Sequence, residues 1–314
     1  MAHVVGALTT SFAVLLVTRV LAALANAGFL AVALSTAVTL VATDQKGRAL
    51  AVLLSGTTVA TIAGVPGGAL LGTLLSWRAT FWAIALLCLP AAFGVVKGIP
   101  ARAGKTPQGT PAGSSLRTEI TQLAMPRLLL VMLLGALVNA ATFATFTFLA
   151  PIVTDTAGLR GLWVSVALVL FGVGSFAGVT LAGRLSDRRP HIVIAIGGPL
   201  LLLGWVALAA LAARPVALLL LVFVQGTLSF AVGSTLIARV LYEAAAAPTM
   251  GGAYATAALN IGAAGGPVVA AVTLGANAGD LGPVRVSALL VAIALLIALP
   301  LLRVITPRTG QAIR

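Results

Sequence analysis

The sequence predicts an all-α protein that crosses a membrane several times. Hydrophobic residues make up 60% of its 314 residues, only 8% are charged, and the mean hydropathy is +1.15. Soluble domains are about half apolar and carry roughly 25% charged residues. Strands of a membrane barrel would alternate apolar and polar residues over about ten positions, and no such alternation occurs. The predicted class is therefore a polytopic α-helical membrane protein.

Long apolar runs with almost no charge supply the predicted membrane helices. Each run approaches or exceeds the roughly 20 residues that a helix needs to cross about 30 Å of hydrocarbon. The nine runs are Phe12–Val41, Ala49–Leu75, Thr80–Val96, Leu128–Val153, Leu162–Leu181, Ile192–Ala212, Pro215–Leu241, Gly251–Leu274 and Val286–Ile305. We therefore expect about nine transmembrane helices.

A polar stretch divides the chain into two helical groups. Residues 98–126 are rich in Pro, Gly and Ser and predict a flexible cytoplasmic linker. Three apolar runs lie before it, in residues 1–97, and six lie after it, in residues 127–314. When the sequence is aligned with itself at an offset of 201 residues, Pro66 aligns with Pro267, and the two prolines lie in corresponding runs of the two groups. Repeated halves of this kind are typical of secondary transporters, which bind substrate between them.

The basic residues indicate orientation rather than a nucleic-acid partner. Most of the 19 Lys and Arg residues fall on one face when the predicted loops are assigned to alternate sides. The positive-inside bias identifies that face as the cytoplasmic one. The partner expected for such a chain is the lipid bilayer. No basic soluble domain is present, so we expect no binding of nucleic acid. Four basic residues fall on the other face: Arg78, Arg160, Arg214 and Arg285.

The chain contains few residues of the types that form catalytic or metal sites. The chain has one cysteine, Cys88, and two histidines, His3 and His191. No Ser/His/Asp set, carboxylate pair or metal-ligand spacing occurs at a common depth. We therefore expect no enzymatic activity, no cofactor and no bound metal.

Four segments resemble the Major Facilitator Superfamily. They are "LLVTRVLAALANAGFLAVAL", "KGRALAVLLSGTTVATIAGVPGGALLGTLLSWRATFW", "LAGRLSDRRP" and "VQGTLSFAVGSTLIARVLYEA". They are similar to its twelve-helix drug:proton antiporters and, within these, to chloramphenicol efflux proteins. The resemblance implies a single-chain, multi-pass exporter in the cytoplasmic membrane of a bacterium. It would move a hydrophobic drug, chloramphenicol first, outward against an inward flow of protons; a sugar or nucleoside exporter is the alternative.

The chain departs from the family pattern at its start. Helices one, two and most of three have no counterpart, and Val4–Thr10 would be the end of the third. The sequence-based expectation is therefore that residues 1–97 form an incomplete N-terminal half. A chain of this kind would not transport by itself, and a non-transporting remnant is the alternative from a different class.

Arg19 is the one charge within the apolar run Phe12–Val41. An intramembrane guanidinium requires a carboxylate or carbonyl partner, and the resemblance places Arg19 at a family arginine associated with proton coupling. All six acidic residues lie in predicted loops or at helix ends. We therefore expect the partner of Arg19 upstream of Met1; in the alternative interpretation, Arg19 extends to the membrane surface.

Two further motifs follow from the resemblance. The antiporter motif corresponds to small residues and a proline on one helix face, with Gly262, Gly266 and Pro267 as counterparts in the second half. The cytoplasmic loop motif would latch neighbouring helices through an aspartate. The alternative interpretation of the antiporter motif is tight helix packing. The alternative interpretation of the loop motif is that its basic residues only set the orientation in the membrane. The residues concerned are Gly56, Gly64, Pro66, Gly67, Gly68 and Gly72 for the first motif, and Gly183, Arg184, Asp187 and Arg188 for the second.

Uncharged polar and aromatic residues inside the runs are candidates for a drug pocket. Asn139, Phe143 and Phe146 share one helix face, since they follow the spacing i, i+4, i+7. Apolar walls with a few amides suit neutral amphipathic drugs. Hydrogen bonds between helices are the alternative role for each polar residue. The complete candidate set is Asn26, Asn139, Phe143, Phe146, Gln225 and Asn260.

Overall fold

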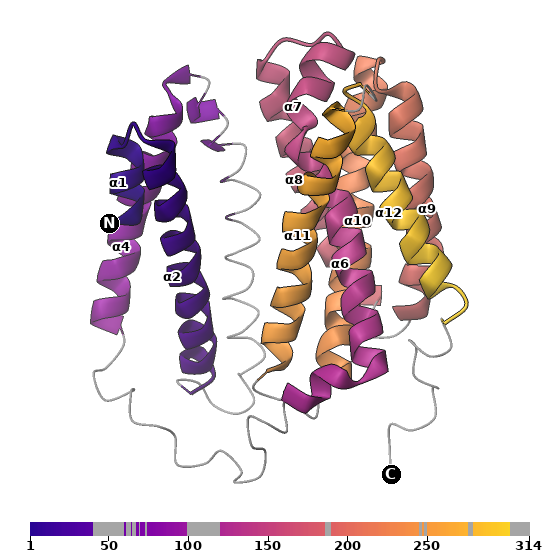
Figure 1. Ribbon diagram of the computed structural model, residues 1–314, viewed down its shortest axis with the longest axis horizontal. Coiled ribbons are helices and arrows are strands. Elements are labelled where there is room, and N and C mark those ends of the chain that lie inside the picture. Colours follow the sequence, from indigo (N-terminus) through magenta and orange to yellow (C-terminus); the bar gives the residue numbers. More distant parts are fainter. Residues whose placement is uncertain are drawn as a thin grey trace. The chain divides into compact units, whose positions relative to one another are not determined.

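Every regular element that the structure describes is a helix, so the predicted all-α class is confirmed (Figure 1). The chain divides into two compact units, Met1–Ala112 and Gly113–Arg314, here called unit 1 and unit 2. The computed structural model describes residues 1–39, 60, 64, 67–68, 70–72, 74–98, 120–185, 190–244, 247, 250–275 and 279–301.

Unit 1 contains a short helix that packs against two long ones. The short helix α1 spans Ala2–Leu8, and it contacts both α2 (Phe12–Thr39) and α4 (Trp77–Gly98). The chain reverses between α1 and α2 in a tight connection, where the Ser11 amide donates to Thr9 Oγ1 at 3.1 Å. This reversal brings His3 of α1 beside Arg19, in the first third of α2. Most of the second expected membrane helix, Ala49–Leu75, lies outside the described residues.

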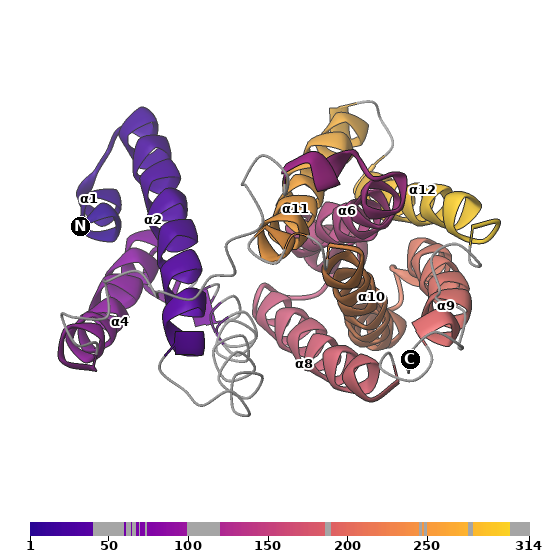
Figure 2. The same cartoon turned by 90° about the horizontal axis from the view of Figure 1, so that it is seen from below.

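Unit 2 is a bundle in which α6 and α10 occupy the middle (Figure 2). Helix α10 packs most extensively on α8 and also contacts α9 and α6, while α6 contacts α11 and α12. The elements are η2 (Gln122–Ala124), α6 (Pro126–Thr147), α7 (Leu149–Pro151), η3 (Ile152–Thr156), α8 (Leu162–Leu185), α9 (Pro190–Leu211), α10 (Pro215–Glu243), α11 (Gly251–Gly275) and α12 (Gly282–Ala298).

Prolines set several of these helix boundaries. Pro126 and Pro215 stand at the first position of α6 and α10, where the missing N–H is not needed for a helical hydrogen bond. The sequence predicted one continuous helix from Leu128 to Val153, but α6 ends at Thr147. Pro151 explains the break, because a proline has no amide to donate and its ring clashes with the carbonyl four residues earlier, at Thr147. A π-helical turn follows, with Ala157 N donating to Ile152 O at 3.1 Å.

The interhelical packing of unit 2 depends on glycines at close approaches. A Cβ at Gly174 or Gly178 of α8 would collide with the carbonyl oxygens of Phe223 and Thr227 on α10. The four-residue spacing of these glycines lets the two backbones approach, as in other membrane helix pairs. The sequence analysis did not single out this pair.

The outer faces of the bundle remain apolar. Leu220 is 63% exposed and Leu296 is 75% exposed, whereas Trp205, Leu201 and Leu218 are buried. A surface of this kind suits lipid rather than water. Six described helices are long and apolar enough to cross a membrane, which supports a multi-pass membrane protein. They are Trp77–Val95, Pro126–Thr147, Leu162–Ala182, His191–Leu211, Pro215–Glu243 and Gly251–Leu274; Phe12–Asn26 and Gly282–Ala298 are shorter apolar helices.

Candidate functional site

Arg19 lies at the centre of a small polar cluster in unit 1. Its Nη1 and Nη2 atoms each lie 3.4 Å from Nδ1 of His3, which is on α1. Its guanidinium carbon also lies 4.3 Å from the centre of the Phe81 ring on α4. All three helices described in unit 1 therefore contribute to the surroundings of this one cation.

The chemistry of the two side chains fixes the direction of the hydrogen bonds. A guanidinium only donates, so Nδ1 of His3 accepts and the ring carries its proton on Nε2. Burial and the neighbouring Arg19 charge lower the pKa of His3, whose helix α1 lies outside the candidate membrane spans. The neutral ring is therefore the favoured form beside Arg19. The Nε atom of Arg19 is buried and has no hydrogen-bond partner among the described residues.

The sequence analysis missed His3 as a neighbour of Arg19. In the sequence, His3 stands before the first long apolar run and shows no sign of a functional role. The partner of Arg19 was expected upstream of Met1. The one acidic residue in the sequence of unit 1, Asp44, lies outside the described residues. His3 and Arg19 are sixteen positions apart in the sequence, which indicates no contact within one helix, and the reversal before α2 brings these two residues together.

The small-residue face of unit 1 is described in part. Gly68 accepts a hydrogen bond from Thr80 Oγ1 at 3.0 Å, and a Cβ at Gly68 would approach the same threonine. At Gly64, Gly67 and Gly72 an added Cβ would meet no described atom within 4 Å. Gly56 and Pro66 of the expected antiporter motif lie outside the described residues.

The counterpart face in α11 packs inside unit 2. A Cβ at Gly262 or Gly266 would collide with the carbonyl oxygens of Ala136 and Ala140 on α6. This geometry supports the tight-packing interpretation for these two glycines. In the expected loop latch, Gly183 and Arg184 belong to the last turn of α8, whereas Asp187 and Arg188 lie outside the described residues.

Unit 2 contains an aromatic pocket that brings together two of the predicted drug-site residues. Phe146 of α6 and Gln225 of α10 line the same cavity of about 10 Å³, together with Phe171 and Trp205. The rings of Phe146 and Phe171 are 4.7 Å apart between centroids, and Phe143 meets Phe146 edge to face at 5.9 Å. The sequence predicted one helix face for Asn139, Phe143 and Phe146; the two phenylalanine rings are in contact, and their role in drug binding stays a prediction.

Only some of the polar side-chain atoms of the residues that line this pocket form hydrogen bonds. Gln225 is 1% exposed, and its Nε2 donates to Leu201 O at 3.3 Å. Its Oε1 and the Nε1 of Trp205 are buried without a hydrogen-bond partner in the described structure. Gln225 and Trp205 thus both line the aromatic pocket, and each carries a buried polar atom without a partner in the described structure. Because unpaired buried polar atoms are costly, the pair suits a small polar group such as a hydroxyl or a water molecule.

The other predicted drug-site residues do not join this pocket. Asn139 Nδ2 donates to Leu259 O on α11 at 2.7 Å, which is the interhelical role left open by the sequence. Asn260 is exposed on α11, and Asn26 is exposed on α2 in unit 1. The sequence analysis did not identify Trp205 and Phe171, which lie in unbroken apolar runs and carry no distinctive spacing.

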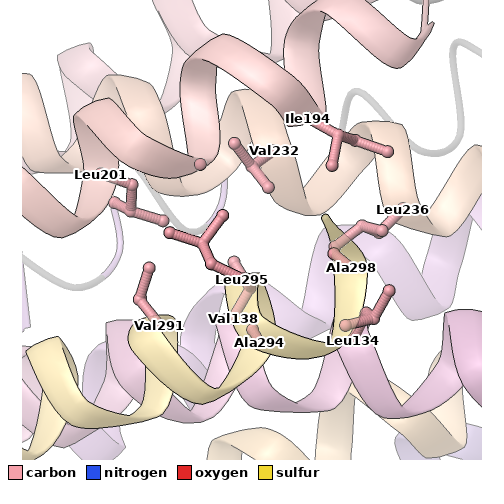
Figure 3. A pocket seen from close by; sticks show the side chains of 11 residues that line it. Leu134, Val138, Ile194, Leu201, Val232, Leu236, Val291, Ala294, Leu295 and Ala298 are labelled. Atoms are coloured by element: carbon pink, nitrogen blue, oxygen red, sulfur yellow. The ribbon is translucent and has the colours of Figure 1, made fainter. Parts of the chain in front are cut away.

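A second cavity in unit 2 is entirely apolar. It has a volume of about 20 Å³ and lies between α6, α9, α10 and α12 (Figure 3). Leu134, Leu201, Val291 and Leu295 are among the side chains that surround it, and none of its lining residues is polar. Such a cavity offers no hydrogen bond to a ligand and is expected to stay dry.

Arg239 and Glu243 form an ion pair at the end of α10. Arg239 Nη2 donates to Glu243 Oε1 at 2.6 Å, and Arg239 is 6% exposed. The guanidinium also lies 4.6 Å from the ring of Tyr242. The sequence analysis counted Arg239 only as a marker of orientation. The i, i+4 spacing was the signal that could have revealed the pair.

Comparison with known proteins places these features in a family. The family model of the Major Facilitator Superfamily matches residues 1–267. The chain is 73% identical to the "Chloramphenicol resistance protein" of Streptomyces lividans over 97% of its own length and 77% of that protein. It is 28% identical to the "Inner membrane transport protein YdhP" of Escherichia coli strain K12, over 86% of its length and 69% of that protein. The described residues contain no cluster of His, Cys, Asp or Glu that could hold a metal ion. This chain belongs to the Major Facilitator Superfamily of membrane transporters.

Proposed function

We propose that this protein exports chloramphenicol, or a similar neutral hydrophobic drug, in exchange for protons. Export would proceed across the cytoplasmic membrane of a bacterium, and the protein would act as a single chain. The observation that carries the proposal is the 73% identity, over 97% of the chain, to a protein named for chloramphenicol resistance.

The chemistry of the pocket in unit 2 supports a neutral aromatic substrate. Chloramphenicol is uncharged and combines an aromatic ring with hydroxyl and amide groups. The pocket has aromatic walls from Phe146 and Phe171, and it is also lined by Gln225 and Trp205, each of which carries an unpaired polar atom. No charged residue lines it. The cavity has room for about one water molecule, so binding of the whole drug would require the surrounding helices to separate.

The cluster around Arg19 supports the proposal of proton coupling. A cation beside a titratable ring responds to the protonation of that ring, because the interaction changes from attractive to repulsive. The proposal assigns residues 1–97 and 127–314 to the two halves of the transporter, with residues 98–126 between them. The small-residue face of unit 1 and the loop after α8 would then serve the movement of helices during transport.

Drug accumulation in cells tests this function directly. The chain would be produced in a chloramphenicol-sensitive bacterium, and the accumulation of radiolabelled chloramphenicol would be measured with and without a protonophore. We expect lower accumulation than in cells that carry the empty vector, and we expect the protonophore to abolish the difference. A labelled nucleoside serves as the control substrate. Equal accumulation in both strains, with the protein present in the membrane, would contradict the proposal and agree with a non-transporting chain.

A further inference from the structure

The pairing of Arg19 with a histidine suggests how unit 1 could respond to protons. We propose that His3 is the proton-binding residue of the export cycle, and that its protonation releases Arg19 from α1. This inference rests on the proposed export function. It adds a specific titratable group, which the sequence analysis expected upstream of Met1.

The hydrogen bonds between the two residues exist in only one protonation state of His3. Neutral His3 offers one lone pair at Nδ1, and this atom lies 3.4 Å from both Nη1 and Nη2 of Arg19. A proton that binds to Nδ1 occupies this lone pair, so both hydrogen bonds break. The imidazolium and the guanidinium are then two cations at the same short separation. The proton later leaves from the same nitrogen, and no other bond changes.

The other charged groups around His3 strengthen this response. Helix α2 contributes Arg19. Helix α4 contributes Arg78, whose Nη2 donates to Thr9 O just after α1, at 3.2 Å. Both groups are basic, and the described residues of unit 1 include no carboxylate. Among the described residues of unit 1, a protonated His3 therefore finds no anion that could replace Arg19 as its partner.

The packing around Arg19 converts this change of charge into a movement. A Cβ at Gly6 of α1 would lie 3.1 Å from Arg19 Nη2 and 3.3 Å from the Phe81 ring. The guanidinium therefore fits closely between α1 and the ring of Phe81. When His3 repels it, the guanidinium cannot move further toward α1. Either the side chain moves along the Phe81 face or α1 separates from α2, and each movement changes the contact among the three helices.

Two substitutions of His3 separate its roles. His3→Asn retains an acceptor oxygen close to the Nδ1 position but cannot take up a proton. His3→Lys places a permanent positive charge beside Arg19. The matched control is His191→Gln, which removes the other histidine at an exposed position at the start of α9. Each purified full-length chain would be reconstituted into proteoliposomes, where exchange of labelled for unlabelled chloramphenicol at equal pH is compared with accumulation driven by a pH gradient.

We expect His3→Asn to retain exchange and to lose accumulation driven by the gradient. His3→Lys should lose both, and His191→Gln should behave like the unaltered protein. Gradient-driven accumulation by His3→Asn at the rate of the unaltered protein would overturn the inference and leave the proposed function intact. If the unaltered protein neither exchanges nor accumulates the drug, the proposed function fails and the role of His3 in export fails with it.

A measurement without transport tests the contact itself. The two histidine rings of protein labelled with ¹⁵N-histidine can be titrated by NMR in detergent micelles, and His191→Gln assigns them. Arg19→Gln removes the positive charge and the donors, so it should raise the pKa of His3 and leave the His191 titration unchanged. If the two His3 titrations coincide, the two residues are not coupled and His3 does not control Arg19, whatever the transport result.

Discussion

The candidate site of unit 1 is built around a cation, Arg19, whereas the aromatic pocket of unit 2 contains a neutral amide, Gln225. Arg19 donates to His3, lies against the Phe81 ring and is half-buried. Gln225 is 1% exposed, makes a single hydrogen bond of 3.3 Å and leaves its oxygen free. A cation in an apolar region requires an acceptor, but a neutral amide can remain partly unsatisfied at a smaller cost.

This difference suggests a division of roles between the two units. The Arg19 cluster changes its interaction energy when a proton binds, so it is suited to sense protons. The Gln225 pocket is lined by aromatic rings and uncharged residues, two of which carry unpaired polar atoms, so it is suited to a neutral group. Substitutions in one unit should therefore change the response to protons, and substitutions in the other should change the affinity for the drug.

The largest effect is expected at Arg19. Arg19→Ala should abolish chloramphenicol resistance while the protein remains abundant in the membrane, because the group that responds to His3 is lost. The measurements are the inhibitory concentration of the drug and the amount of protein by immunoblot. Arg127→Ala is the control, since Arg127 is an exposed arginine in the first turn of α6 and belongs to neither the Arg19 cluster nor the pocket. Full resistance with Arg19→Ala would favour the alternative that Arg19 merely extends to the membrane surface.

A smaller effect is expected at Gln225. Gln225→Leu removes one hydrogen bond within the protein and one free acceptor, so the stability should change by no more than about 1 kcal/mol. Loss of a neutral hydrogen bond to the drug should raise the KM for chloramphenicol by roughly threefold to tenfold, with little change in the maximal rate. Transport kinetics in proteoliposomes measure both quantities.

The control for Gln225 is a polar residue outside the pocket. Thr180→Val removes an exposed hydroxyl on α8 that donates only to Phe176 O, four residues earlier in the same helix. This variant should retain the KM of the unaltered protein. A KM that also remains unchanged in Gln225→Leu would show that Gln225 serves helix packing alone. A loss of gradient coupling in Gln225→Leu would contradict the division of roles between the two units.

The sequence predicted the helices more successfully than their contacts. The beginnings of α2 and α10 agree with the apolar runs to the residue, because apolar length and proline are local properties of the chain. The end of α6 differed because Pro151 was included in an apolar run and its effect on Thr147 was not considered. Local patterns therefore place most helices, provided that prolines are read together with hydropathy.

The neighbours of the functional residues could not be predicted in the same way. His3 reaches Arg19 through a chain reversal, and Trp205 reaches Gln225 across the contact of α9 with α10. Neither pair has a spacing that the sequence alone makes recognisable. Asn139 and Gln225 were equivalent candidates as amides in apolar runs. The structure separates them, because the Asn139 amide nitrogen donates to the Leu259 carbonyl and Gln225 lines a pocket.

The smallest effect is expected in the apolar cavity of unit 2, which contrasts with the polar pocket in the same bundle. Val291→Ile adds one methyl group at a residue that lines the cavity of about 20 Å³. At about 24 cal/mol per Å³ of cavity, filling it should stabilise the protein by at most about 0.5 kcal/mol. Thermal unfolding in detergent measures this gain, and Val291→Ala should shift the midpoint in the opposite direction. The KM for chloramphenicol should not change in either variant, because no polar atom lines this cavity. A changed KM would show that the drug uses the apolar cavity, and binding could then not be assigned to the Gln225 pocket alone.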